Sequence, residues 1–244
     1  MNFKERSLLF AKLSKISYYS EKKAKSQAKK LGFTTVEFYN RDGAQAFRFA
    51  NDIDCVIACR GTQPTEFNDI KADLKAMPVV AETVSRVHKG FKEEVDELWP
   101  MIKDDLEDLK HTDVNVWFTG HSLGAAMATI MASRCTNHTF FPDVQELYTY
   151  GSPRVGWKKY CKSLNVVHHR WKNNNDIVTK VPLTIMGYKH DGTEHYITSD
   201  QKIGKPGLRD WWKGLWEGAK NGRFDSISDH DITAYYNNIK KALP

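Results

Sequence analysis

The feature that most constrains the fold of this chain is a Gly-x-Ser-x-Gly turn, residues 120–124, between an apolar run and a stretch of small residues. Residues 114–119 are typical of a buried strand, and residues 123–132 predict a helix that is apolar nearly all round. A strand that turns sharply into a helix at such a motif holds its serine clear of the backbone, with glycines where strand and helix approach closely. We therefore predict that Ser122 is a catalytic nucleophile, with the Leu123 amide at the helix N-terminus, where anions are stabilised.

The alternative is a chance match in an ordinary loop. At average composition, about 0.05 such matches are expected per chain. The flanking strand and helix patterns favour the nucleophile over this alternative.

The rest of the chain predicts an α/β fold with a mainly parallel central sheet and helices on both faces, in one domain spanning residues 1–244. Helical spacing predicts helices over residues 4–19 and 21–30, one beginning near residue 87, and an amphipathic C-terminal helix from residue 232. Strand patterns cover residues 33–39 and 44–49, joined by the turn at residues 40–43, and then residues 55–59, 146–150 and 164–171.

Charge and cysteine content exclude several classes of protein. The net charge of +6 favours anionic surfaces such as phospholipid, but it is too diffuse for nucleic-acid binding. The cysteines lack metal-type spacing, which predicts reduced core thiols: Cys55, Cys59, Cys135 and Cys161. No apolar run reaches the ~18 residues of a membrane span. Residues 1–20 lack the apolar core of a secretory signal, so we expect a cytoplasmic location unless another route exports the chain.

Candidates for the acid and the base follow the serine in the chain. Asp176 comes just after the strand predicted over residues 164–171, at the functional edge of an open α/β sheet, although a simple Asx-turn residue is an equal alternative. His88 precedes the serine, against the usual chain order, and is more consistent with a packed structural histidine. His190, His195 and His230 all follow Asp176, and His230 lies in a loop that suits a base.

A second donor for an oxyanion is expected in the loop after an earlier strand. Thr62 stands at this place, three residues after the end of the strand predicted over residues 55–59, and both its amide and its hydroxyl are suitable donors. A simple surface turn is the alternative.

Seven short motifs in one order resemble the class 3 lipases, the fungal-type lipase family of the α/β-hydrolase fold, from about Val56 to Tyr236. They are Arg60-Gly61-Thr62, residues 87–91, residues 119–125, residues 150–156, Asn175-Asp176-Ile177-Val178, residues 188–192 and Asp229-His230. The resemblance implies a triad of Ser122, Asp176 and His230, with an oxyanion hole formed by Thr62 and the amide of Leu123. It implies neither a metal nor an organic cofactor.

By the same resemblance, the expected substrate is a glycerolipid or another carboxylic ester. The chain departs from the family at Ala125, where a glycine is usual, and in residues 64–74, the lid of family lipases, which are polar here. The polar lid leaves a short-chain esterase of the same fold as an alternative, and the basic charge makes a phospholipase another. A non-catalytic lipase-like interaction protein is the alternative from a different class.

A tryptophan-rich stretch, residues 205–220, is the other unusual feature of the sequence. Leu208, Trp211, Trp212, Leu215 and Trp216 share one helical face, while basic residues lie largely off it. Core packing is the more usual explanation of such a stripe, and peripheral contact with a lipid surface is the alternative.

Overall fold

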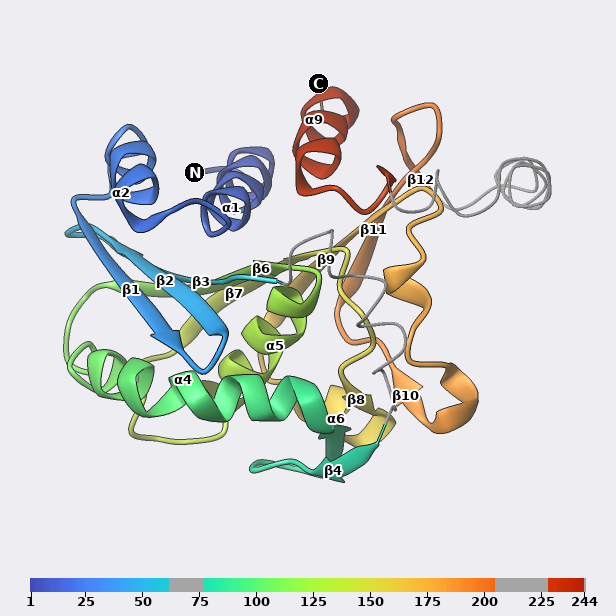
Figure 1. Ribbon diagram of the computed structural model, residues 1–244, viewed down its shortest axis with the longest axis horizontal. Helices are drawn as coiled ribbons and strands as arrows, with labels where there is room; N and C mark the ends of the chain where they lie inside the picture. The colour runs from blue at the N-terminus through green and yellow to red at the C-terminus, as the bar shows by residue number, and fades with distance from the viewer. Residues whose placement is uncertain (62–76, 205–227, 244) are drawn as a thin grey trace.

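The computed structural model describes residues 1–61, 77–204 and 228–243, and a central sheet organises this part of the chain (Figure 1). Its strand order is β1-β2-β3-β6-β7-β9-β11-β12. The bounds are β1 (Thr35–Arg41), β2 (Ala44–Ala50), β3 (Asp54–Cys59), β6 (Asn115–His121), β7 (Val144–Tyr150), β9 (Val167–Asn173), β11 (Thr193–Ile197) and β12 (Ile203–Gly204). Thr62, residues 64–74 and the tryptophan-rich stretch lie outside the described residues.

The sheet is mixed and mostly parallel, as predicted. Strands β3, β6, β7, β9 and β11 run parallel to one another, while β1 and β2 at one side and β12 at the other are antiparallel additions. The predicted hairpin is formed by β1 and β2, whose turn places Asp42 and Gly43 at φ 48° and 92°. Because the carboxyl ends of parallel strands meet at the same end of a sheet, the residues that follow β6 and β9 lie close together there.

Helices cover both faces of the sheet, which confirms the predicted layers (Figure 1). One face carries α1 (Phe3–Ile16), α2 (Glu21–Lys29) and α9 (Ile232–Ala242), and the other carries α4 (Lys89–Glu107), α5 (Leu123–Thr136) and the short α6 (Lys158–Ser163). Each side has its own apolar core. A sheet buried on both faces explains why β3 and β6 read as continuous apolar runs rather than as alternating ones.

The helices form where the sequence offers caps and one apolar stripe. In α1, Asn2 and Glu5 make a reciprocal capping box, which satisfies backbone N–H groups at the helix N-terminus. In α4, the buried residues Val95, Leu98, Ile102 and Leu106 recur at helical spacing. Helix α5 is buried over nearly its whole length, as its apolar sequence predicts.

A second, smaller sheet lies beside α4 and α6 and was not predicted. Its order is β10 (Tyr188–Lys189), β8 (Gly156–Trp157), β5 (Arg86–His88) and β4 (Pro78–Val80), and all of its pairs are antiparallel. Strands of two or three residues are too short to show a period in the sequence. The strand predicted from residue 164 also begins later, at Val167, because Leu164 still caps α6.

His88 lies in this second sheet as a packed histidine. Its ring stacks on that of Phe91 at a centroid distance of 4.1 Å, and burial lowers its pKa to about 4. It packs into the core, which agrees with the structural role favoured by the sequence.

The four cysteines are free and buried. Burial raises the pKa of the Cys55 and Cys161 thiols to about 12, so they remain protonated at neutral pH. Within the described ranges, none of the helices combines the length and apolar character needed to span a bilayer.

Candidate active site

The serine of the Gly-x-Ser-x-Gly motif occupies a sharp turn between β6 and α5. Ser122 has φ 60° and ψ −129°, a strained conformation for a residue with a side chain. A Cβ on Gly120 would lie 2.2 Å from the carbonyl oxygen of Gly124, and one on Gly124 would lie 2.3 Å from that of Cys59. Both positions therefore require glycine for steric reasons, and the strain at Ser122 is held by close backbone packing.

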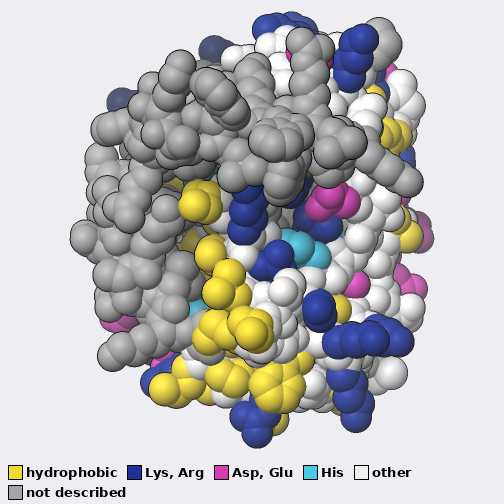
Figure 2. All heavy atoms as spheres, turned by 90° about the vertical axis from the view of Figure 1, so that its right-hand side faces the viewer, with side chains coloured by type: hydrophobic (Ala, Val, Ile, Leu, Met, Phe, Trp, Pro, Cys, Tyr) yellow, Lys and Arg dark blue, Asp and Glu magenta, His cyan; other side chains and the backbone are white. Residues whose placement is uncertain are grey.

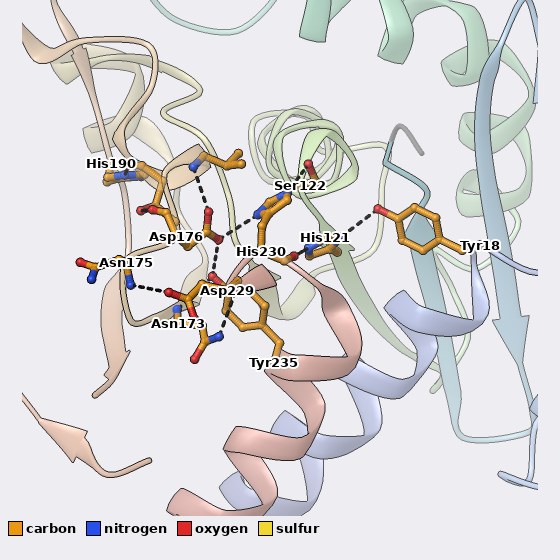
Figure 3. Close-up of polar contacts among 12 residues, drawn as sticks. Tyr18, His121, Ser122, Asn173, Asn175, Asp176, His190, Asp229, His230 and Tyr235 are labelled. Carbon is orange, nitrogen blue, oxygen red and sulfur yellow. Dashed lines mark hydrogen bonds and ion pairs between the residues drawn. The ribbon is translucent and has the colours of Figure 1, made fainter. Parts of the chain in front are cut away.

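Ser122, His230 and Asp176 form a continuous hydrogen-bonded series (Figure 3). The Nε2 atom of His230 lies 2.7 Å from Ser122 Oγ, and its Nδ1 atom lies 2.8 Å from Asp176 Oδ2. Ser122 follows β6, Asp176 follows β9, and His230 lies two residues before the start of α9 at Ile232. The structure therefore brings together, from distant parts of the chain, the three residues assigned to the triad by resemblance.

The Asp176 carboxylate is fully buried and accepts hydrogen bonds at both oxygens. Its Oδ1 accepts from the Val178 amide at 2.9 Å, and its Oδ2 accepts from the Tyr235 hydroxyl at 2.6 Å as well as from His230. Burial and the neighbouring carboxylate raise the pKa of Tyr235 well above its ordinary value, so its hydroxyl stays protonated and donates. These donors stabilise a buried charge that would otherwise be costly.

The loop that carries His230 is attached to the loop that carries Asp176 by a separate set of hydrogen bonds. The Asp229 carboxylate accepts from Asn174 Nδ2 at 3.0 Å and from the Asn175 amide at 3.1 Å. Asn173 Nδ2 donates to the Asp229 carbonyl at 2.9 Å. The three consecutive asparagines before Asp176 thus fix the position of the base relative to the acid; Figure 3 labels two of them, Asn173 and Asn175.

Gly151, which follows β7, gives the acid and the base room to meet. It has φ 60°, and a Cβ there would lie 2.8 Å from Asp176 Oδ2 and 2.9 Å from His230 Cε1. This contact gives a physical reason for the glycine of the sequence motif at residues 150–156.

His121, next to the nucleophile, points away from Ser122 and holds the loop of the base. Its Nε2 lies 2.6 Å from the His230 carbonyl oxygen, and its Nδ1 lies 2.8 Å from the Tyr18 hydroxyl (Figure 3). A carbonyl oxygen only accepts, so Nε2 carries the proton, and Nδ1 accepts from Tyr18. Burial, together with the proximity of His230, lowers the pKa of His121 well below its usual value, consistent with this neutral form.

The oxyanion candidates are described only in part. The amide of Leu123 is the first of α5, where N–H groups lack acceptors within the helix. Thr62 is among the residues that the structure does not describe, so its place relative to Ser122 stays a prediction.

The other candidate bases lie elsewhere. His190 Nε2 bonds to the Thr179 carbonyl at 2.7 Å, and burial lowers its pKa to about 3. His195 Nε2 lies 3.1 Å from His169 Nδ1, on a strand away from the nucleophile. Across the described ranges, no group of three or more His, Cys, Asp and Glu side chains is arranged to hold a metal ion.

Chemically, the series can move a proton from Ser122 to His230 while the Asp176 carboxylate stabilises the imidazolium. The residues around the series were not identified from the sequence. Tyr235 reads there as an apolar-face residue of the C-terminal helix, and Tyr18 as the end of the N-terminal one. Only the fold brings these side chains to the site.

Comparisons with known proteins identify the family of the chain. Residues 56–186 match the family model of lipase (class 3). The secreted mono- and diacylglycerol lipase A of Penicillium cyclopium is 37% identical over 109 residues, which is 41% of this chain and 35% of that protein. Toxin TseL of Vibrio cholerae is 27% identical over 195 residues, 62% of this chain and 30% of that one. The matches thus span about a third of the length of these curated relatives.

Solved structures show the same fold. The triacylglyceride lipase of Rhizomucor miehei superposes with a TM-score of 0.68 over 94% of both chains at 22% identity. A triacylglycerol lipase whose structure is described as having a serine protease triad superposes with a TM-score of 0.69 at 22% identity, over 93% of this chain and 92% of that one. The central sheet and its helical layers are therefore those of the fungal lipases, which have the α/β-hydrolase fold. Since the family model covers more than half of its residues, the chain belongs to the class 3 lipase family.

Proposed function

We propose that this protein hydrolyses carboxylic esters of glycerolipids through an acyl-enzyme on Ser122. The observation that carries the proposal is the hydrogen-bonded series from Ser122 Oγ through His230 to the buried Asp176, with distances of 2.7 and 2.8 Å. A serine in an ordinary turn has no reason to be strained, backed by a histidine and connected to a buried carboxylate at once. Membership in the lipase family supports an ester substrate.

In the proposed mechanism, His230 Nε2 takes the proton of Ser122 as its Oγ attacks the ester carbonyl. The oxyanion that forms faces the Leu123 amide at the start of α5, and Thr62 is the proposed second donor. The imidazolium then protonates the leaving alcohol, and the acyl group stays on Ser122. Water, deprotonated by the same histidine, releases the carboxylic acid and regenerates the serine.

The neighbours of the triad have defined tasks in this scheme. Asp176 keeps the proton of neutral His230 on Nδ1, so that Nε2 faces the serine as an acceptor. Tyr235 and the Val178 amide hold the carboxylate in place. His121 is a positioning residue, because it bonds to the backbone of His230 and not to the serine.

The test combines activity with covalent labelling. Purified protein is assayed on p-nitrophenyl esters of increasing acyl length and on emulsified diacylglycerol, then treated with a fluorophosphonate probe and mapped by mass spectrometry. Ser122→Ala should lower kcat by about 10⁴ or more while leaving the thermal unfolding curve near wild type. The probe should attach to Ser122 alone.

Ser133→Ala, on the same helix, is the matched control. Its hydroxyl is fully buried and lies 3.2 Å from that of Thr83, outside the hydrogen-bonded series, so activity and labelling should persist. Retention of a tenth of the activity by Ser122→Ala would contradict the proposal and favour a lipase-like interaction protein. A strong preference for the shortest esters, with no activity on diacylglycerol, would replace the glycerolipid substrate by a short-chain ester.

A further inference from the structure

Three large apolar side chains stand exposed at one turn that follows the candidate acid in the chain, two of them within the turn and one on the residue just before it. The turn is η3 (Thr184–Met186), and the exposed fractions are 55% for Leu183, 90% for Ile185 and 44% for Met186. Single exposed apolar residues are common on protein surfaces, but a group of them on one protrusion marks an interaction site. We refer to Leu183, Ile185 and Met186 as the η3 surface.

The backbone beneath the η3 surface is anchored from both sides. Before the turn, Arg154 Nη1 donates to the Pro182 carbonyl at 2.8 Å and also to the Lys180 carbonyl. After the turn, Gly187 has φ 89° and lies so close to the Trp157 ring that a Cβ would be 3.0 Å from its Nε1. These anchors explain how three apolar side chains are held outside the core.

Basic residues flank the η3 surface in the chain and beside the Trp157 ring next to it. Lys180 and Lys189, on either side of the turn, are exposed, and the Arg86 guanidinium lies over the Trp157 ring at 5.4 Å. Among the described residues, none of these three cations forms an ion pair. The carboxylates that follow in the chain are engaged elsewhere: Asp191 with His168 and Glu194 with Arg170.

Figure 2 shows the right-hand side of Figure 1, where η3 lies beside β10. Hydrophobic side chains gather on its lower half, and Lys and Arg side chains lie around them, with few acidic ones among them. An apolar centre with a cationic margin complements a surface that is apolar inside and negatively charged outside. A lipid bilayer with anionic headgroups has this arrangement.

We propose that the η3 surface docks the protein on anionic lipid, with Leu183, Ile185 and Met186 entering the boundary between headgroups and acyl chains. This docking rests on the proposed function and adds to it the part of the protein that contacts the lipid containing the substrate. The chain from Asp176 to η3 is short, so docking here places the edge of the sheet that carries the acid close to the lipid. Lys180, Lys189 and Arg86 supply the attraction to the headgroups.

The test measures partitioning onto vesicles separately from chemistry. Binding is measured by sedimentation with vesicles of phosphatidylcholine alone and of phosphatidylcholine with phosphatidylglycerol in equal parts, all in the Ser122→Ala background so that no lipid is hydrolysed. Ile185→Ser should weaken partitioning onto the anionic vesicles by about tenfold, the effect of removing one inserted aliphatic side chain. Lys180→Gln combined with Lys189→Gln should weaken it further at low salt and have little effect at high salt.

Ile53→Ser is the matched control. Ile53 is 64% exposed, but it precedes β3 and so lies at the amino ends of the parallel strands, whereas Ser122 and Asp176 lie at their carboxyl ends. Its partitioning should equal that of the parent protein. In the active background, Ile185→Ser should leave kcat on dissolved p-nitrophenyl butyrate unchanged, and its unfolding temperature should match wild type because the side chain is exposed.

Several outcomes would overturn the docking surface. Partitioning of Ile185→Ser equal to that of the parent would do so, as would equal binding to neutral and anionic vesicles. A parent protein that forms a dimer which Ile185→Ser dissolves would assign the surface to a second copy of the chain. If the protein turns over the dissolved ester normally but does not bind vesicles, the docking surface is rejected and the proposed function stands. If vesicle binding depends on Ile185 but no ester is turned over, the proposed function alone is rejected.

Discussion

Asp176→Asn is the substitution for which the structure gives the most detailed expectation. The carboxylate of Asp176 accepts three hydrogen bonds: from the Val178 amide at 2.9 Å, His230 Nδ1 at 2.8 Å and the Tyr235 hydroxyl at 2.6 Å. All three partners donate. Asparagine has one oxygen and one NH₂ group, so it cannot accept from all of them. With its oxygen toward Val178, its NH₂ group faces His230.

The consequence for His230 follows from its two ring nitrogens. Facing an NH₂ group, Nδ1 must accept, which moves the imidazole proton to Nε2. Nε2 lies 2.7 Å from Ser122 Oγ and in that tautomer cannot take the serine proton. We therefore expect kcat to fall by about 10⁴, which corresponds to about 5 kcal/mol in the activation free energy. The loss of charge-assisted hydrogen bonds should lower the free energy of unfolding by about 3 kcal/mol.

Asp191→Asn is a control within the same chain. Asp191 also pairs with a buried histidine, His168, at 3.1 Å, but the other ring nitrogen of His168 bonds to Thr149 at 2.8 Å and reaches no nucleophile. The assay is kcat on a dissolved p-nitrophenyl ester at pH 8, with urea unfolding in parallel. Asp191→Asn should lose stability and keep kcat within about threefold of wild type. The reasoning is refuted if Asp176→Asn retains more than a tenth of the wild-type kcat, or if Asp191→Asn loses as much activity as Asp176→Asn.

Three further expectations concern the surroundings of the series. Tyr18→Phe removes the hydroxyl that donates to the buried His121. Because this displaces the loop that carries His230, it should lower kcat about tenfold with little change in KM. A kcat equal to that of wild type would show that the loop keeps its position without this hydrogen bond. Burial lowers the pKa of His190 to about 3, so between pH 6.5 and about 4 the unfolded chain binds more protons than the folded one, and the free energy of unfolding should fall on acidification by up to about 1.4 kcal/mol per pH unit for such a histidine. Urea unfolding measured at several pH values from 7 to 4 should show that the free energy of unfolding of His190→Asn depends less steeply on pH than that of wild type. An equal pH dependence would assign the acid sensitivity to other groups. Gly124→Ala places a Cβ 2.3 Å from the Cys59 carbonyl oxygen and should cost about 3 kcal/mol or more of stability, measured by thermal unfolding, whereas an unchanged melting temperature would mean that strand and helix can separate at the elbow.

Features with a local cause were predictable from the sequence. The elbow around Ser122 depends on two glycines and an apolar strand and helix that adjoin each other in the chain, and the structure has β6 and α5 there. The hairpin of β1 and β2 follows from its turn residues, and the stripe of α4 from its periodicity. The position of Asp176 followed from the general rule that polar residues after parallel strands meet at one edge.

Features that depend on distant pairing were not predictable in this way. From the residues alone, the loop setting favoured His230 as the base but left His190 and His195 possible, and the choice of His230 came from resemblance to a family. The structure separates them because its loops bring His230 to the serine across 108 residues of sequence. Tyr18 and Tyr235 carried no distinguishing signal, because a tyrosine in a helix or just after one looks the same in the sequence whether its hydroxyl meets water or a buried polar partner. The second sheet was missed because its strands are too short to show a period.

The hydrogen bond between His121 and the backbone of His230 has a use in spectroscopy. The His121 ring is buried, and its Nε2 lies 2.6 Å from a carbonyl oxygen, so exchange of the Nε2 proton with solvent should be slow enough to give a separate downfield proton resonance. That resonance belongs to a residue that takes no part in proton transfer, yet it exists only while the segment bearing His230 is seated. Observing this resonance by NMR would therefore report whether the segment that bears His230 is in place, without any substrate or inhibitor bound.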